Sequence, residues 1–197
     1  MATEVFSRRQ LADPGWYQFI FGNIYMAPIW TLVRLYVGWQ WLQAGWHKVD
    51  GDGWINNNGS SLKAFWERIV VVPEQGNPAI TYDWYRDFIK YMLDHGWYDW
   101  FAVLIAFGEL FVGLALIVGA FTGIAALFGA TLNFNFMLAG SASTNPVLML
   151  LAILLILAWK VSGYIGLDRW LLPALGTPWQ VGPAFQLLRR RHAPERP

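Results

Sequence analysis

The feature that most constrains this sequence is a run of sixty residues, from Trp100 to Trp159, that contains one charged side chain, Glu109. A helix that crosses a lipid bilayer needs about 20 predominantly apolar residues. The run is therefore long enough for three such helices. Charged residues make up only 14% of the whole chain, against about 25% in ordinary soluble domains. The sequence therefore predicts an integral membrane protein of the all-α class.

Glycine, proline and polar residues divide the apolar run into three predicted spans, and a fourth is expected upstream. A tight turn is predicted at residues 119–123 and a polar break at 140–145. The upstream stretch is apolar except for Arg34 and a few uncharged polar residues. The predicted fold is a bundle of four transmembrane helices, at residues 24–43, 100–119, 121–139 and 146–164. These spans and the long loop at 44–99 belong to a membrane domain at residues 24–172. A segment at 1–23 precedes this domain, and a Pro/Arg-rich tail at 173–197 follows it.

The long loop between the first two spans contains two amphipathic patterns. Apolar residues recur at helical spacing over residues 62–72 and again over 81–95. Ser60 or Ser61 could cap the first helix and Thr81 the second. Amphipathic helices that connect spans suit the membrane interface. These two are expected either to form a lid over the outer mouth of the bundle or simply to cover its helix ends.

Lysine and arginine residues outside the spans set the expected orientation. Arg8 and Arg9 precede the first predicted span, and Lys160, Arg169 and the arginine run at 189–191 follow the last. Positive charges near the ends of spans favour the cytoplasmic side of a membrane. Both termini are therefore expected in the cytoplasm, and the long loop is expected outside.

Composition excludes several kinds of site and partner. The net charge of +1 provides no field that would attract nucleic acid. The sequence has no cysteine, which excludes Cys-ligated zinc and iron–sulfur clusters within this chain. None of its three histidines, His47, His95 and His192, falls in the middle of a predicted span, so a haem with two histidine ligands is excluded as well. No metal site is expected, and a redox role would need a bound organic carrier or a partner.

Two ionisable residues, Arg34 and Glu109, fall near the middle of predicted spans. Insertion scales give a cost of about 2.5–3.5 kcal/mol for such a charge, so each needs a partner or a function. Because the two spans would be antiparallel neighbours, we expect Arg34 and Glu109 to pair, directly or through one polar bridge, and we take both as candidate catalytic residues. The pair could fix helix register, form the polar floor of a ligand pocket or relay protons.

Further candidates for ligand contact follow Arg34 on the first span. Trp41 falls on the same helical stripe as Arg34, where it could form the wall of a pocket. Gln43 and His47 share another stripe near the outer end of the span. His47 and Lys48 are expected at the outer interface, where His47 would be either solvated or involved in proton handling.

The third span carries two asparagines, Asn133 and Asn135, on different helical faces. Amide groups in hydrocarbon must find hydrogen-bond partners on other helices. Both residues could serve packing alone. Alternatively, one of them could donate a hydrogen bond to a ligand with a carbonyl group, such as a quinone.

Several spaced motifs of the sequence resemble the DoxX/DoxD family, and the resemblance covers residues 28–172. The motifs are RLYVGWQWLQAGWHK at 34–48, GELFVGLALIVGAFTG at 108–123, NFNFMLAGSASTNP at 133–146 and GYIGLDR at 163–169. The resemblance implies a four-helix membrane protein of bacteria or archaea. It also suggests a redox context, because DoxD is the membrane subunit of thiosulfate:quinone oxidoreductase, an activity that also involves a partner subunit.

Two hypotheses of function follow from the residues and the resemblance together. The first is a quinone-interacting subunit of a membrane oxidoreductase, in which Arg34 polarises a quinone oxygen and Glu109 orients Arg34 or carries a proton. The second is a non-catalytic accessory or scaffold subunit of a larger bioenergetic complex, which leaves open whether the chain is an enzyme. Expected partners are the lipid bilayer and either other membrane or periplasmic subunits or further copies of the chain. A transporter has less support, because no inverted repeat is evident.

Overall fold

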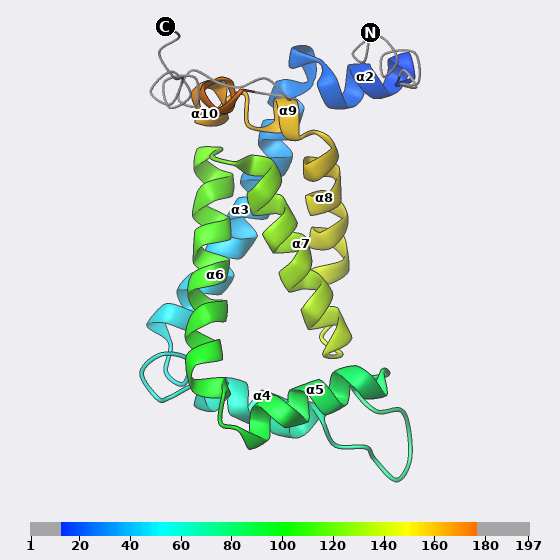
Figure 1. Ribbon diagram of the computed structural model, residues 1–197, viewed down its shortest axis with the longest axis vertical. Coiled ribbons are helices and arrows are strands. Elements are labelled where there is room, and N and C mark those ends of the chain that lie inside the picture. Colours follow the sequence, from blue (N-terminus) through cyan, green and yellow to red (C-terminus); the bar gives the residue numbers. More distant parts are fainter. Residues whose placement is uncertain (1–12, 177–197) are drawn as a thin grey trace, which may run out of the picture.

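The structure is a computed structural model that describes residues 13–176, and every regular element in that range is a helix. Four helices form an elongated bundle, and shorter helices lie across both of its ends (Figure 1). The bundle consists of α3 (Ala27–Asp50), α6 (Tyr98–Val118), α7 (Thr122–Leu138) and α8 (Asn145–Leu157).

The two ends of the bundle carry different elements. We call one the lid end, where α4 (Ser60–Ile69) and α5 (Asp83–Asp94) lie across the bundle (Figure 1). The other is the terminal end, with the short elements α2 (Gly15–Gly22), η1 (Ile24–Met26), α9 (Trp159–Ser162) and α10 (Asp168–Leu175). Most of the predicted 1–23 segment and 173–197 tail, including all their arginines, lies outside the described residues.

One helix of the described part, α6, is by itself long and apolar enough to cross a membrane. A second candidate joins α2 to η1 and α3 across a bend of 52°. The apolar helices α7 and α8 have 17 and 13 residues, or about 25 and 20 Å against a hydrocarbon core of about 30 Å. The prediction of four full spans therefore stays a prediction.

The outward faces of the bundle helices nonetheless carry large apolar side chains. Leu32, Phe111, Phe128 and Leu150 are each more than half exposed. A soluble monomer rarely exposes apolar surface along the whole length of a bundle. These faces are suited to lipid.

The close approach of α3 and α6 depends on glycines. A Cβ atom on Gly45 would lie 2.5 Å from the backbone nitrogen of Leu110, and one on Gly113 would lie 2.5 Å from that of Leu42. Small residues at such crossings let two helix backbones pack together. The crossing fixes the register of the two helices, with Gly45 opposite Leu110.

The lid has a hydrophobic core of its own rather than a loose surface layer. Tyr85, Ile89 and Met92 of α5 are buried together with Leu62 and Trp66 of α4. The same cluster includes side chains from the adjoining ends of α6 and α7. The predicted amphipathic faces are therefore confirmed as packing faces against the bundle.

The caps predicted for the lid helices were wrong. Gly59, not Ser60 or Ser61, precedes α4, and it has a left-handed φ of 68°. A Cβ at this position would also collide with the carbonyl oxygen of Tyr98, so only glycine fits there. Tyr82 rather than Thr81 precedes α5.

Two other boundaries differ from the prediction. The first bundle helix continues beyond residue 43 to Asp50, because its packing against α6 extends through Gly45. The last one ends at Leu157, and the chain resumes as α9. The turn predicted at residues 119–123 is confirmed, with Gly119 and Phe121 both at positive φ.

Candidate functional site

Glu109 pairs with Lys48 and not with Arg34, which corrects the sequence prediction. The Lys48 ammonium nitrogen lies 2.6 Å from Glu109 Oε2. Glu109 is 1% exposed and Lys48 19%. The register set at Gly45 explains the choice of partner, because Lys48 follows one helical turn later. Arg34 lies eleven residues before Gly45, or about 16 Å further along the helix at 1.5 Å per residue.

Two aromatic rings also lie near the Lys48 ammonium. Its nitrogen lies 5.0 Å from the centroid of the Trp54 ring and 6.0 Å from that of Phe136. A cation over a ring face is stabilised by the ring's quadrupole. The carboxylate of Glu109 and the two rings thus stabilise the positive charge of the Lys48 ammonium at a position where it is only 19% exposed.

A cavity of about 370 Å³ opens beside this ion pair. Its volume falls within the range of small-molecule sites, about 300–1,000 Å³. One side is aromatic, with Trp41 and Phe136 at a ring-centroid distance of 6.5 Å and both lining the space. A polar part of the lining comes from the connection between α7 and α8, with Ser141, Ser143 and Thr144. A flat ligand with polar edges would match both parts of the lining.

The residues predicted for ligand contact on the first span divide into two groups. Trp41 and Lys48 line the cavity, together with Glu109. Gln43 and His47 are exposed and do not line it. Gln40, which the sequence did not single out as a ligand contact, lines the cavity because it lies on the same side of α3 as Ala44 and Lys48.

The two asparagines of α7 lie apart from the ion pair. Asn133 is fully buried inside the bundle, without a hydrogen-bond partner for its amide among residues 13–176, and it does not line the cavity. Asn135 faces the lid, where its amide nitrogen donates to the carbonyl oxygen of Thr131 at 2.8 Å. The prediction that they point to different faces is confirmed.

The lid is tied to Asn135 through Tyr85. The Tyr85 hydroxyl donates to the backbone oxygen of Asn135 at 3.2 Å and approaches its side-chain oxygen at 3.4 Å. Burial raises the pKa of the Tyr85 hydroxyl above its ordinary value. A hydroxyl kept neutral in this way can act as a permanent hydrogen-bond donor between the lid and the bundle.

Arg34 lies at the terminal end, where it binds backbone carbonyls. Its guanidinium donates to the carbonyl oxygens of Leu116, of Ile117 at 3.0 Å and of Ile165 at 2.9 Å. The last carbonyls of a helix have no partner within that helix. Arg34 therefore satisfies the end of α6 and attaches the segment before α10 to it, and it is not part of the cavity.

Asp168 completes this arrangement, which we call the terminal clasp (Arg34 and Asp168 with their backbone partners). Its carboxylate accepts from the backbone nitrogens of Phe121 at 2.6 Å and Thr122 at 2.9 Å, at the start of α7. A Cβ on Gly119 would lie 2.6 Å from the Arg34 guanidinium and 3.0 Å from Gly166. The sequence pointed to this segment only through the resemblance of its Gly- and Asp-containing motif.

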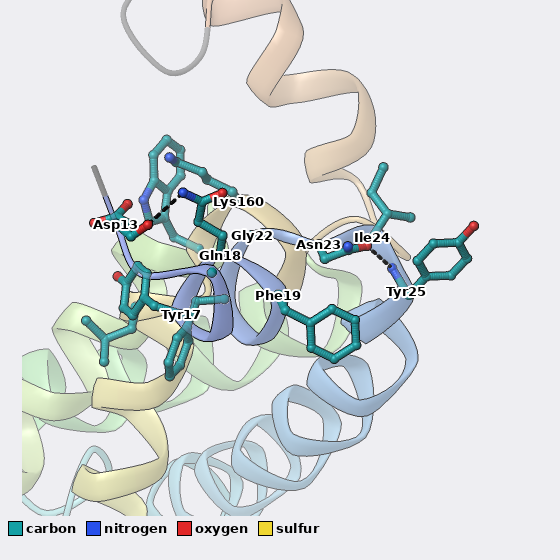
Figure 2. Close-up of a pocket in the computed structure, with 13 residues that line it drawn as sticks. Asp13, Tyr17, Gln18, Phe19, Gly22, Asn23, Ile24, Tyr25 and Lys160 are labelled. Carbon is teal, nitrogen blue, oxygen red and sulfur yellow. Dashed lines mark hydrogen bonds between the residues drawn. The ribbon is translucent and has the colours of Figure 1, made fainter. Parts of the chain in front are cut away.

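A second, wider hollow of about 1060 Å³ lies beside α2 at the terminal end (Figure 2). Gln18 and Asp13 both line it, and the Gln18 amide nitrogen donates to the backbone oxygen of Asp13 at 2.8 Å. Its charged side chains, Asp13 and Lys160, are both exposed. Because the ion-pair cavity combines a buried carboxylate with an ammonium, it is the stronger candidate for chemistry.

Comparison with known proteins places the chain in a family. A family model described as DoxX matches residues 29–142, more than half of the chain. The matched range contains both residues of the ion pair. No curated protein and no solved structure matches the chain. On the strength of the family match, the chain belongs to the membrane-associated DoxX family.

Proposed function

We propose that this chain is a quinone-binding membrane subunit of an oxidoreductase, and that the quinone ring binds in the cavity beside Lys48 and Glu109. The observation that supports this most is the buried Lys48–Glu109 pair at the wall of a cavity of about 370 Å³. In this proposal α3, α6, α7 and α8 all cross the membrane. Both termini are cytoplasmic, so the lid covers the outer face.

The chemistry of the cavity walls fits a quinone. A quinone ring is flat and apolar, with oxygen atoms that accept hydrogen bonds at opposite edges. The Lys48 ammonium has three N–H donors, of which Glu109 engages one. Trp41 and Phe136 provide ring surfaces for stacking. Gln40, Ser141 and Ser143 also line the cavity and provide further polar groups for contact with the ring oxygens.

A bound quinone would supply two-electron, two-proton redox chemistry. Lys48 orients the ring by donating from Nζ to one of its oxygens. Glu109 Oε2 is the atom that takes up or releases a proton, and Lys48 tunes that affinity through its charge. The lid restricts access of water to the pair. The sequence has no cysteine, so the chain cannot supply electrons from an iron–sulfur cluster or a thiol of its own. We propose that another membrane or periplasmic subunit holds the electron donor, or that the donor delivers electrons to an oligomer of this chain.

The proposal is tested with the full chain in lipid nanodiscs, by titration with a short-tailed benzoquinone and by analysis of quinone in the native preparation. Lys48→Gln removes a charge-assisted hydrogen bond worth about 1.5–3 kcal/mol, so the quinone Kd is expected to rise on the order of 10- to 100-fold. Glu109→Gln is expected to retain folding but to lose the proton uptake that accompanies quinone reduction.

The exposed pair Lys63–Glu67 on α4 provides the matched control. Its charged atoms lie 3.7 Å apart and its side chains are 45% and 54% exposed. Lys63→Gln and Glu67→Gln are expected to leave quinone binding unchanged. A wild-type chain that binds no quinone but copurifies with another subunit would overturn the proposal in favour of an accessory role. Equal losses of expression and activity in Glu109→Gln would assign the pair to architecture.

A further inference from the structure

The ion-pair cavity is adjoined by a second cavity under the lid. This lid cavity has a volume of about 170 Å³ and lies between α4, α5, α6 and α7. Leu62, Phe65 and Phe136 line both cavities. The two spaces therefore meet at these three apolar side chains.

The lid cavity in turn adjoins a groove on the outside of the bundle. This groove has a volume of about 500 Å³ and runs along α6 and α7. Leu104 and Leu132 line both the lid cavity and the groove. The three spaces thus form a series that leads from the buried ion pair to the outward face of two bundle helices.

The groove is apolar, and its shape follows from the sequence. The residues that line it are aliphatic, aromatic or glycine. A Cβ atom on Gly108 would have no neighbour within 4 Å, so this glycine leaves open space where a side chain would otherwise fill the surface. Phe111 and Phe128 border the groove and are 64% and 62% exposed. A groove of this kind on a membrane-associated protein is suited to contact with lipid chains.

In the lid cavity and the groove, polar groups are few. In the lid cavity, Tyr85 donates to Asn135, and Asn135 donates to its own helix. The charged groups lie at the other end, in the ion-pair cavity. The series is therefore amphipathic along its length, with a polar head region, an apolar middle and an apolar exit.

We infer that the ligand of the ion-pair cavity is a quinone with a long isoprenoid tail, and that its tail passes Phe65 and Phe136 into the lid cavity and leaves along the groove between α6 and α7. This inference rests on the proposed function and names the substrate class of the same site. The ring enters sideways from the lipid and not from the aqueous phase.

The dimensions agree with a tail of several isoprene units. From Phe136, at the head region, to Phe121, at the far end of the groove, α7 runs through fifteen residues. At 1.5 Å per residue this is about 22 Å. A short-tailed quinone would occupy only the first part of this path.

The test uses two photoreactive benzoquinones with the full chain in nanodiscs. One is short-tailed and carries an azide on the ring, and the other carries a diazirine near the end of a long isoprenoid tail. The ring probe is expected to label residues of the ion-pair cavity. The tail probe is expected to label the groove, on peptides that contain Phe111 or Phe128. This labelling needs only the wild-type chain, so it does not depend on the folding of any variant.

A variant pair adds an affinity readout. Leu132→Trp fills the junction between the lid cavity and the groove. It is expected to raise the Kd of the long-tailed quinone about tenfold, the equivalent of two buried methylene groups, and to change that of the short-tailed quinone less than twofold. Leu127→Trp is the control, because Leu127 lies on the same helix, is 56% exposed and lines none of the three spaces.

The outcomes separate this inference from the proposed function. Ring labelling in the cavity with tail labelling elsewhere would overturn the tail path and leave the quinone site in place. Equal weakening of both quinones by Leu132→Trp would also count against the path. If neither probe labels the chain specifically, the proposed function fails and the inference fails with it.

Discussion

Lys48 of α3 and Glu109 of α6 form an ion pair of 2.6 Å at the point where Gly45 brings the two helix backbones together. Neither residue would reach the other without that close crossing. The pair is asymmetric, because the carboxylate is fully buried and the ammonium is 19% exposed beside a cavity. Because of this asymmetry, removing the ammonium and neutralising the carboxylate are expected to change the stability of the protein by different amounts.

Removing the ammonium is expected to be worse for stability than neutralising the carboxylate. Lys48→Met leaves a buried carboxylate without a partner and should lower the free energy of unfolding by about 3–5 kcal/mol. Glu109→Gln leaves Lys48 among its aromatic rings and should cost less. Unfolding in mixed micelles, followed by tryptophan fluorescence, measures both. The double variant should recover part of the loss, and a double-mutant cycle without coupling would contradict the pair.

The α3–α6 crossing should not tolerate a methyl group. Gly45→Ala would place a Cβ 2.5 Å from the backbone of Leu110, so the helices must separate and the ion pair must lengthen. We expect a loss of at least about 2 kcal/mol, comparable to overpacking in a core. Gly108→Ala on the same bundle is the control, since its Cβ would meet nothing within 4 Å. Because alanine has a higher helix propensity than glycine, Gly108→Ala is expected to stabilise the protein by up to about 1 kcal/mol. Equal thermal stability of the two variants would refute this role of Gly45.

Arg34 should matter for the terminal end and not for ligand binding. Arg34→Met leaves three carbonyl oxygens without their donor. Hydrogen exchange should therefore rise at residues 116–123 and 163–168. The Kd for a short-tailed quinone should stay within about twofold of the wild-type value, whereas a loss of 1.4 kcal/mol in binding would raise it about tenfold. Arg169→Met, at an exposed position, is the control. A large loss of quinone affinity in Arg34→Met would return Arg34 to the binding site.

The attachment of the lid should weaken at alkaline pH. Burial raises the folded-state pKa of Tyr85 above its unfolded value of about 10. Its contribution is therefore complete below pH 10 and is lost as the pH rises from there through the folded-state pKa. Hydrogen exchange in α4 and α5 between pH 8 and 11 should show this loss. Tyr85→Phe should abolish the dependence, and Tyr91→Phe, half exposed on the same helix, should retain it. An unchanged profile in Tyr85→Phe would rule out this role of the hydroxyl.

Much of the fold follows from the sequence by simple physics. The apolar run between Trp100 and Trp159 becomes most of α6 and all of α7 and α8, and the glycine turn between α6 and α7 is where expected. Helical periodicity also placed Arg34 and Trp41 on one stripe of the first span, where both are buried, and it identified the packing faces of the lid. Each of these features depends on local sequence spacing, which the chain displays directly.

The partner of Glu109 could not be obtained in the same way. The prediction aligned the two helices by depth in the membrane alone, because Arg34 and Glu109 both fall near the middle of their predicted spans. The actual register comes from contact between α3 and α6 at Gly45. The useful signal was present, because Lys48 follows Gly45 on the same stripe, but the position opposite Gly45 depends on tertiary packing. The clasp residue Asp168 was missed for the same reason, since its partners lie more than forty residues earlier.

The terminal clasp has a consequence for where this folding unit ends. The family match stops at residue 142, yet Asp168 supplies the capping carboxylate for α7, and Ile165 accepts a hydrogen bond from Arg34. A fragment cut at the edge of the matched region would lack both groups and would leave the first amides of α7 without their acceptor. The shortest fragment that retains all of these contacts therefore extends through Asp168.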